Sequence, residues 1–172
     1  MHGKTELHLA AEHDDPDRAE ALLAAGAELE ARTDWGATPL DWAGVLGNRA
    51  VADVLIAHGA HLSPVAAAGL GIAAKTEPHQ LDDAFALACR NGHTAIARAL
   101  LAQGARVDAR GYFNAPAIHW AAINGHADTV AFLLEAGADP DLKDDEFDAD
   151  ALGWAREGNS PSVVELLDRR HR

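Results

Sequence analysis

The chain has 172 residues, a length that suits one domain or one compact repeat array, and 48% of them are apolar but only 5% aromatic. The formal net charge of −13 argues against a nucleic-acid partner, because surfaces that bind phosphates carry a basic footprint. The negative charge disfavours an anionic membrane surface for the same reason, and it favours either a basic partner or simple solubility.

The N-terminal residues 1–5 lead directly into repeat-like sequence, without the apolar segment of a signal peptide. The longest apolar run, residues 65–74, is interrupted by Gly69 and Gly71 and is much shorter than the ~20 residues that span a bilayer. Cys89 is the only cysteine, so an internal disulfide and a thiolate metal cage are excluded. We therefore expect a cytoplasmic protein.

An internal repeat is visible along the whole chain. The dipeptide Gly-Ala begins at Gly26, Gly59, Gly104 and Gly137, with gaps of 33, 45 and 33 residues. A pair of aliphatic residues precedes each of these glycines in the same register and occurs once more at Leu166. Two independent markers with one period indicate a repeat architecture.

Each unit reads as two short helices followed by a turn-rich finger. In one unit Val130, Leu133 and Leu134 have the i, i+3, i+4 spacing that places apolar side chains on one helix face. Gly137 follows where a helix end favours a positive φ. Upstream lies an alanine-rich helix, whose start in the second unit is Thr38-Pro39, a capping hydroxyl followed by a proline.

The units resemble ankyrin repeats, whose signature is a unit of about 33 residues carrying Thr-Pro-Leu-His-x-Ala. The matching segments are residues 5–11, 38–43 and 116–122, the inter-helix turns Gly92-His93 and Gly125-His126, and the finger motifs at 26–32 and 137–143. The resemblance implies an all-α solenoid of about five to six helix-turn-helix units with β-turn fingers.

One central unit is expected to be degenerate. Residues 63–71 look like the first helix of a unit, but residues 72–79 are too short for a normal second helix and finger. We expect a single domain over residues 1–172. Its approximate units are 4–35, 36–62, the degenerate 63–79, 80–113, 114–147 and 148–172.

The ten histidines do not form a recognisable catalytic or metal-binding pattern. His8 and His119 occupy the family's Thr-Pro-Leu-His position, where the resemblance implies a buried ring bonded to neighbouring backbone. His58 and His61 are spaced i, i+3 but flank a loop and lack a third ligand. We therefore expect no enzyme activity, no metal and no cofactor.

The resemblance implies a protein partner held in a concave groove by the first helices and the finger tips. The residues expected to contact it are Glu12, His13, Asp34, Trp35, Val45, Leu46, Arg90, Asn91, Tyr112, Phe113, Ile123, Asn124, Asp145 and Glu146. Phe147 also lies at a finger tip. The finger aromatics have two interpretations: anchors for a partner, or packing against the adjacent finger.

An alternative is a small-molecule or unusual enzymatic site at the irregular joint, residues 63–83, where a pocket could open between the two halves. Its polar candidates are His79, Asp82, Asp83 and Arg90. Trp42, Trp120 and Trp154 share one register on the first helices and are expected to pack in the core. We expect a monomer, with self-association through the concave face as a further possibility.

Overall fold

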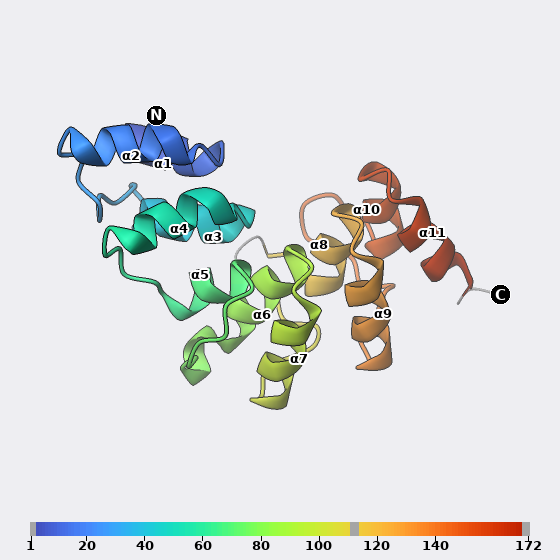
Figure 1. Ribbon diagram of the computed structural model, residues 1–172. Coiled ribbons are helices and arrows are strands. Elements are labelled where there is room, and N and C mark those ends of the chain that lie inside the picture. The colour runs from blue at the N-terminus through green and yellow to red at the C-terminus, as the bar shows by residue number, and fades with distance from the viewer. Residues whose placement is uncertain (1–2, 111–113, 170–172) are drawn as a thin grey trace.

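The computed structural model describes residues 3–110 and 114–169, which form a curved row of short helices (Figure 1). The α-helices are α1 (Glu6–Glu12), α2 (Pro16–Ala24), α3 (Pro39–Leu46), α4 (Arg49–Ala57), α5 (Pro64–Gly69), α6 (Leu81–Arg90), α7 (Thr94–Ala102), α8 (Ala117–Ile123), α9 (Ala127–Glu135), α10 (Ala151–Glu157) and α11 (Pro161–Asp168). A 3-10 helix, η1 (Pro78–Gln80), precedes α6. The expectation of an all-α solenoid is confirmed.

The helices form two rows. In the inner row α1, α3, α5, α6, α8 and α10 pack successively on one another, and in the outer row α2 packs on α4, α7 on α9 and α9 on α11. Helix α5 has no outer helix of its own, because residues 72–77 run without helical structure to η1. The outer row is therefore interrupted between α4 and α7.

Helix starts and inter-helix turns follow from local sequence. The hydroxyl of Thr38 accepts a hydrogen bond from the Asp41 amide at 3.1 Å, and the Asp150 carboxylate accepts one from the Gly153 amide at 2.7 Å. The turn between the helices of a pair needs a left-handed residue, which Gly92 supplies with φ of 76° and Asn159 with φ of 50°. These local devices reverse the chain between the two helices of a pair.

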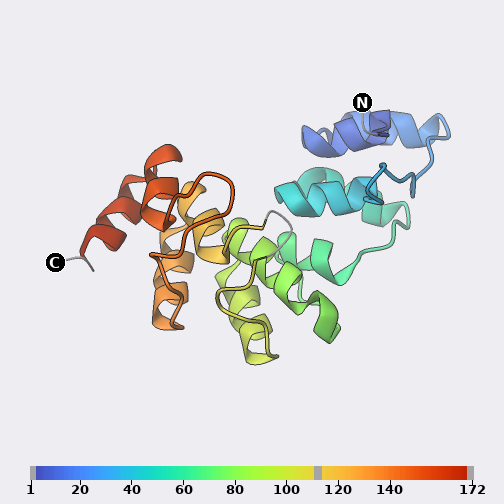
Figure 2. The ribbon, with the colours of Figure 1, turned by 180° about the vertical axis from the view of Figure 1, so that it is seen from behind.

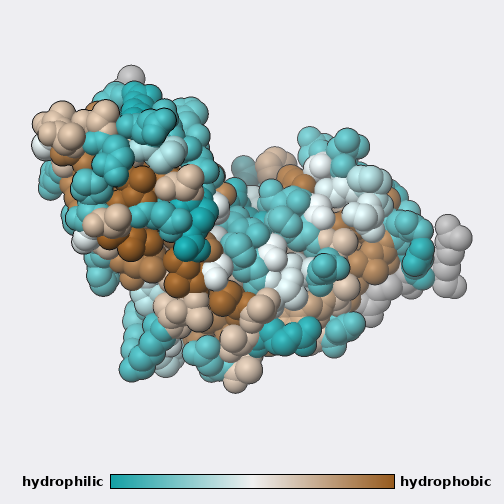
Figure 3. Space-filling view, viewed as in Figure 1, coloured by the Kyte–Doolittle hydropathy of each residue, from teal (hydrophilic) through white to brown (hydrophobic). Residues whose placement is uncertain are grey.

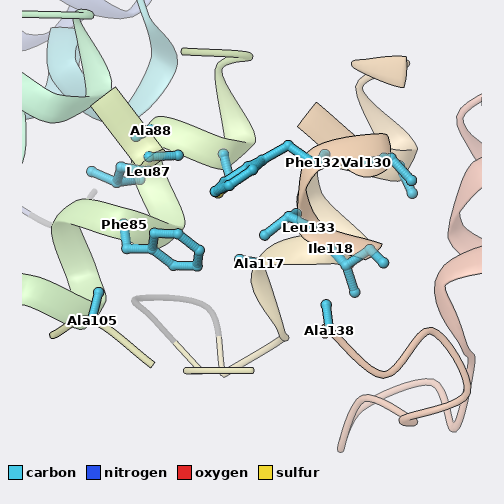
Figure 4. Packing of buried hydrophobic residues seen from close by; sticks show 14 of the residues in the cluster. Phe85, Leu87, Ala88, Ala105, Ala117, Ile118, Val130, Phe132, Leu133 and Ala138 are labelled. Atoms are coloured by element: carbon cyan, nitrogen blue, oxygen red, sulfur yellow. The ribbon is translucent and has the colours of Figure 1, made fainter. Parts of the chain in front are cut away.

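The buried side chains form two clusters that meet at α5. The N-terminal cluster includes Leu7, Leu40 and Leu55, and it ends at Leu70. The C-terminal cluster begins at Val65 and continues to Leu167; Figure 4 shows its middle, where Phe85, Ile118 and Leu133 lie. The helices of α1–α4 also run at an angle to those of α6–α9, with α5 at the bend (Figures 1 and 2).

Two glycines allow α3 and α5 to approach closely at this bend. A Cβ atom added to Gly69 would lie 2.2 Å from the Gly44 carbonyl oxygen, so no side chain fits there. The Asn91 amide, at the end of α6, donates to the carbonyls of Gly44 at 3.1 Å and Gly69 at 2.8 Å. The Asn91 side chain thus connects the C-terminal ends of α3, α5 and α6 by hydrogen bonds.

The interruption of the outer row leaves apolar groups near the surface. Half-buried Ile72 packs on the N-terminal cluster and half-buried Ile96 on the C-terminal cluster. In Figure 3 an apolar band crosses the visible face from the N-terminal half to the bend. None of the described helices is long and apolar enough to cross a bilayer.

Candidate functional site

The tip of the first finger (residues 25–38) carries an exposed aromatic ring. Trp35 is 55% exposed and stacks on Trp42 of α3, with 6.3 Å between ring centroids and 26° between planes. Lys4 Nζ lies 4.2 Å from the centroid of the same Trp42 ring and donates to Glu12 at 2.8 Å. This hydrogen bond from Lys4 lowers the pKa of Glu12.

The last finger (residues 136–150) repeats this arrangement. Phe147 is 67% exposed and meets Trp154 of α10 edge to face, with centroids 6.3 Å apart. Trp154 in turn meets Trp120 of α8 at 5.0 Å and 74°. The guanidinium carbon of Arg90 lies 5.2 Å from the Trp120 centroid. A continuous row of side-chain contacts therefore runs from Arg90 on α6 through the two tryptophans to Phe147 in the last finger.

Asp144, which was not among the expected site residues, organises the last finger. Its buried carboxylate accepts hydrogen bonds from the amides of Glu146 at 2.8 Å and Phe147 at 2.6 Å, and from the Trp154 indole at 2.9 Å. Burial raises the pKa of Asp144, but these donors and the Ala149 amide outweigh burial and hold the pKa at about 2. The finger tip is therefore fixed from within by an ionised carboxylate.

The sequence contains a weak signal for this role of Asp144. In the first finger Thr33 stands at the equivalent place, and its hydroxyl accepts a hydrogen bond from the Ala37 amide at 3.1 Å. Asp and Thr are both residues whose side chains bond backbone amides a few residues onward. A comparison of the fingers could have identified Asp144 as a loop-forming residue.

Two hollows flank Phe147 on the side of the inner helices. One has a volume of about 570 Å³, and its lining includes Trp120, Trp154 and the acidic residues Asp145 and Glu146. The other has a volume of about 480 Å³, and its lining includes Ile123, Trp154 and Glu157. Both volumes fall in the range of about 300–1,000 Å³ that is usual for ligand sites.

The structure gathers the expected contact residues into two sets. Near Trp42 lie Trp35 and Glu12, with Asp34 exposed beside Trp35. Around Trp120, Trp154 and the two hollows lie Arg90, Ile123, Asp145 and Glu146. Tyr112 and Phe113 lie outside the described residues.

Several of the expected contact residues already form hydrogen bonds or ion pairs within the chain. The Asn91 amide is bonded to Gly44 and Gly69, and an Arg90 Nη donates to the Val45 carbonyl. Asn124 and His13 bond carbonyls of their own helices, at 2.8 Å in each case.

The remaining expected residues differ in exposure and pairing. Asp145 forms an ion pair with Arg110 at 3.0 Å. Val45 and Leu46 are half-buried at the end of α3, whereas Glu146 is exposed.

The polar candidates at the irregular joint do not converge. Asp82 bonds Arg106 of the following finger at 2.8 Å, His79 is exposed on η1, and Arg90 lies at the opposite end of α6 from Asp82 and Asp83. The hollow at the joint has a volume of only about 40 Å³. This is far smaller than the usual ligand site, so the hollows beside Phe147 are the stronger candidate.

The histidines at the signature position have the expected structural role. His8 Nε2 donates to the Ala37 carbonyl at 3.0 Å and His119 Nε2 to the Ala149 carbonyl at 3.1 Å, each tying an inner helix to the next finger. His58 pairs instead with Glu20 at 2.9 Å. Within the described ranges, no three His, Cys, Asp or Glu side chains are arranged to hold a metal ion. Cys89 is buried, which raises the pKa of its thiol.

Comparisons with known proteins find the same repeat in other chains. Residues 70–144 match the family model described as Ankyrin repeats (3 copies), and residues 2–34 match the model described as Ankyrin repeat. The chain is 32% identical over 166 residues to the Ankyrin repeat and KH domain-containing protein mask-1 of Caenorhabditis elegans, an alignment covering 95% of this chain and 6% of that protein.

Two further relatives align over most of the chain. The B-cell lymphoma 3 protein homolog of Mus musculus is 32% identical over 146 residues, which are 83% of this chain and 30% of that protein. The Neurogenic locus notch homolog protein 1 of Xenopus laevis is 29% identical over 146 residues, which are 84% of this chain and 5% of that protein.

The chain spans less than a third of the length of each of these relatives. The two family models together match more than half of the chain, and the helix pairs, fingers and signature histidines agree with them. The chain belongs to the ankyrin repeat family.

Proposed function

We propose that this chain is a non-catalytic protein-binding module that holds its partner on the side formed by the inner helices and the finger tips. The observation that carries the proposal is the placement of Trp35 and Phe147. They are the exposed large hydrophobic side chains of the described residues, and each lies at a finger tip against an inner-row tryptophan. Solvent-exposed aromatics held rigidly from one side are typical anchors of protein interfaces.

We propose further that the partner presents a basic surface. The last finger and the start of α10 concentrate negative charge, since residues 139–150 contain seven acidic side chains and one lysine. The two hollows beside Phe147 open within this acidic region. Complementary charge accelerates encounter and is screened by salt, so association should slow as ionic strength rises.

The test begins with a selection of binders from a displayed library of proteome fragments, followed by affinity measurements on variants. Phe147→Ala and Trp35→Ala are expected to weaken binding about thirtyfold, the loss of a hot-spot side chain worth about 2 kcal/mol, while the melting temperature stays near that of the wild type. Selected binders whose affinity is unchanged by both substitutions would contradict the proposed surface.

A matched pair of charge variants tests whether the last finger, rather than the acidic surface in general, attracts a basic binder. Glu146 lies in the last finger and Glu135 at the end of the outer helix α9, and both are exposed. Glu146→Gln should slow association with a basic binder more than Glu135→Gln, because of the two only Glu146 lines a hollow beside Phe147. Equal effects of the two substitutions would indicate non-specific attraction.

A core variant is the control for folding. Leu133 is fully buried in the C-terminal cluster, and Leu133→Ala should cost about 2–5 kcal/mol of unfolding free energy. Its apparent affinity should fall only in proportion to the loss of folded protein. A fall in melting temperature of the same size for Phe147→Ala would show that the finger tip is a packing residue.

A further inference from the structure

The inner-row tryptophans differ in what lies over their rings. Lys4 covers Trp42 with its ammonium 4.2 Å from the centroid, and Arg90 covers Trp120 with its guanidinium carbon at 5.2 Å. Trp154 has the same place on its helix, but its ring packs against the rings of His119, Trp120 and Phe147. Within residues 3–110 and 114–169, no lysine or arginine lies over Trp154.

Whether a cation lies over the tryptophan ring depends on the last residue of the preceding inner helix. Arg90 ends α6 and reaches the tryptophan of the next unit. Glu12 ends α1 and holds Lys4 over Trp42 by a hydrogen bond of 2.8 Å. Ile123 ends α8, and it lines the apolar hollow beside Trp154. The chain therefore supplies a cation to two of these tryptophans and an aliphatic side chain to the third.

The hollow of about 570 Å³ beside Trp154 has the walls of a cation site. Trp120 and Phe147 both meet Trp154 edge to face, at 74° and 68°, and all three rings line this hollow, with Phe147 the most exposed of them. Ring faces attract cations through their quadrupole, and the attraction grows as the cation loses water.

Carboxylates complete the same hollow. Asp145 is neutralised in part by Arg110 and also accepts from the Asn114 amide, whereas Glu146 is exposed and has no ion pair among the described residues. A cation entering the hollow would thus meet the exposed Phe147 ring and the uncompensated Glu146 carboxylate, with Arg90 already lying over Trp120. A neutral side chain of the same shape would gain only the apolar contact.

We propose that this hollow receives the charged end of a lysine or arginine side chain from the basic partner, with the aliphatic stem lying along Phe147. The proposal rests on the proposed function and names the chemistry that its site recognises. The occupant is one side chain of a protein segment, since the hollow opens on the surface between the last finger and the inner helices.

The test uses pairs of short peptides titrated into the 15N-labelled chain and followed by NMR at the tryptophan indole signals. One pair is acetyl-Gly-Ala-Arg-Ala-Gly-amide and its citrulline counterpart, and the other carries lysine or Nε-acetyl-lysine. We expect a charged peptide to shift the Trp120 and Trp154 indole signals more than that of Trp42 and to bind about tenfold more tightly than its neutral counterpart.

Variants of the chain show whether the charged peptide binds in this hollow. Phe147→Ala and Glu146→Gln should each weaken binding of the charged peptide, and Glu135→Gln should leave it unchanged because Glu135 lies at the end of α9 and outside the lining of the hollow. Equal binding of charged and neutral peptides would overturn the proposal. So would the absence of indole shifts at millimolar peptide, or binding that neither Phe147→Ala nor Glu146→Gln weakens.

The same experiment separates this inference from the proposed function. A selected partner that needs Trp35 and Phe147, but binds equally after each of its lysines and arginines is neutralised, would leave the protein-binding function standing and remove the cation site. A partner whose affinity is unchanged by Trp35→Ala and Phe147→Ala would contradict the proposed binding surface, whatever the result with the peptides.

Discussion

At the scale of single residues, polar side chains join several inner helices to the next unit. His8 and His119 donate to finger carbonyls 29 and 30 residues onward. In the second unit Asp41 replaces histidine, and its carboxylate accepts from Thr38 and, at 2.8 Å, from the Ser63 hydroxyl. The sequence predicts the histidine role, because a buried ring requires partners, but it does not predict that Asp41 serves a similar purpose.

Removal of one such group should cost stability. His119→Ala is expected to lower the free energy of unfolding by about 1–3 kcal/mol, since a buried hydrogen bond is lost. His13→Ala should change it little, because His13 is exposed and bonds only the Leu9 carbonyl of its own helix. Urea unfolding of the two variants makes the comparison, and equal losses would contradict it.

Asp144 gives the last finger a distinct pH dependence. A carboxylate whose folded pKa is about 2, below its ordinary value of 3.8, stabilises the fold above about pH 4 and loses that contribution as the pH falls toward 2. Stability of the wild type should therefore fall more steeply across this range than that of Asp144→Asn. Unfolding measured from pH 5 to pH 2 tests this, and parallel curves would show that Asp144 is not stabilised by its donors.

At the scale of elements, the bend depends on the close contact of α3 and α5. Gly69→Ala should destabilise by about 1–3 kcal/mol, as overpacking does, because the new methyl group would meet the Gly44 carbonyl. Gly153→Ala in α10 is the matched control, since its nearest neighbours are 3.4 Å away and alanine favours a helix by up to about 1 kcal/mol. Chemical denaturation should separate the two variants, and equal behaviour would contradict the close packing.

The missing outer helix should appear in amide hydrogen exchange. Residues 73–77 donate no backbone hydrogen bonds within the described part of the chain, whereas α4 and α7 on either side are hydrogen-bonded helices. Exchange is expected to be fastest over residues 73–77 and slow in α4 and α7. Uniform protection from residue 60 to residue 90 would mean that the segment packs as a complete repeat.

At the scale of the whole molecule, much of the fold was predictable because ankyrin units are defined by local spacing. The paired aliphatic residues and finger glycines are enough to locate the helix pairs. The convergence of α3, α5 and α6 on Asn91 was not predictable, since it depends on how residues 63–80 fold into α5, an extended segment and η1. Asn91, expected to contact a partner, is instead bonded across this joint.

The candidate site was predictable in its residue types but not in its arrangement. Sequence placed Trp35 and Phe147 at finger tips and left open whether they pack or bind. In the structure each rests on an inner-row tryptophan and remains more than half exposed, so packing holds the ring while a face stays accessible. Such ring contacts depend on the orientation of neighbouring units, which residue spacing does not specify.

The proposed function requires that a partner binds the side formed by the inner helices and the finger tips. Amide hydrogen exchange of the chain, with and without a selected binder, measures this most directly. We expect the binder to slow exchange in the first finger around residues 33–37 and in the last finger around residues 144–149, with little change in α7, α9 and α11. Protection centred on these outer helices, with both fingers unchanged, would contradict it.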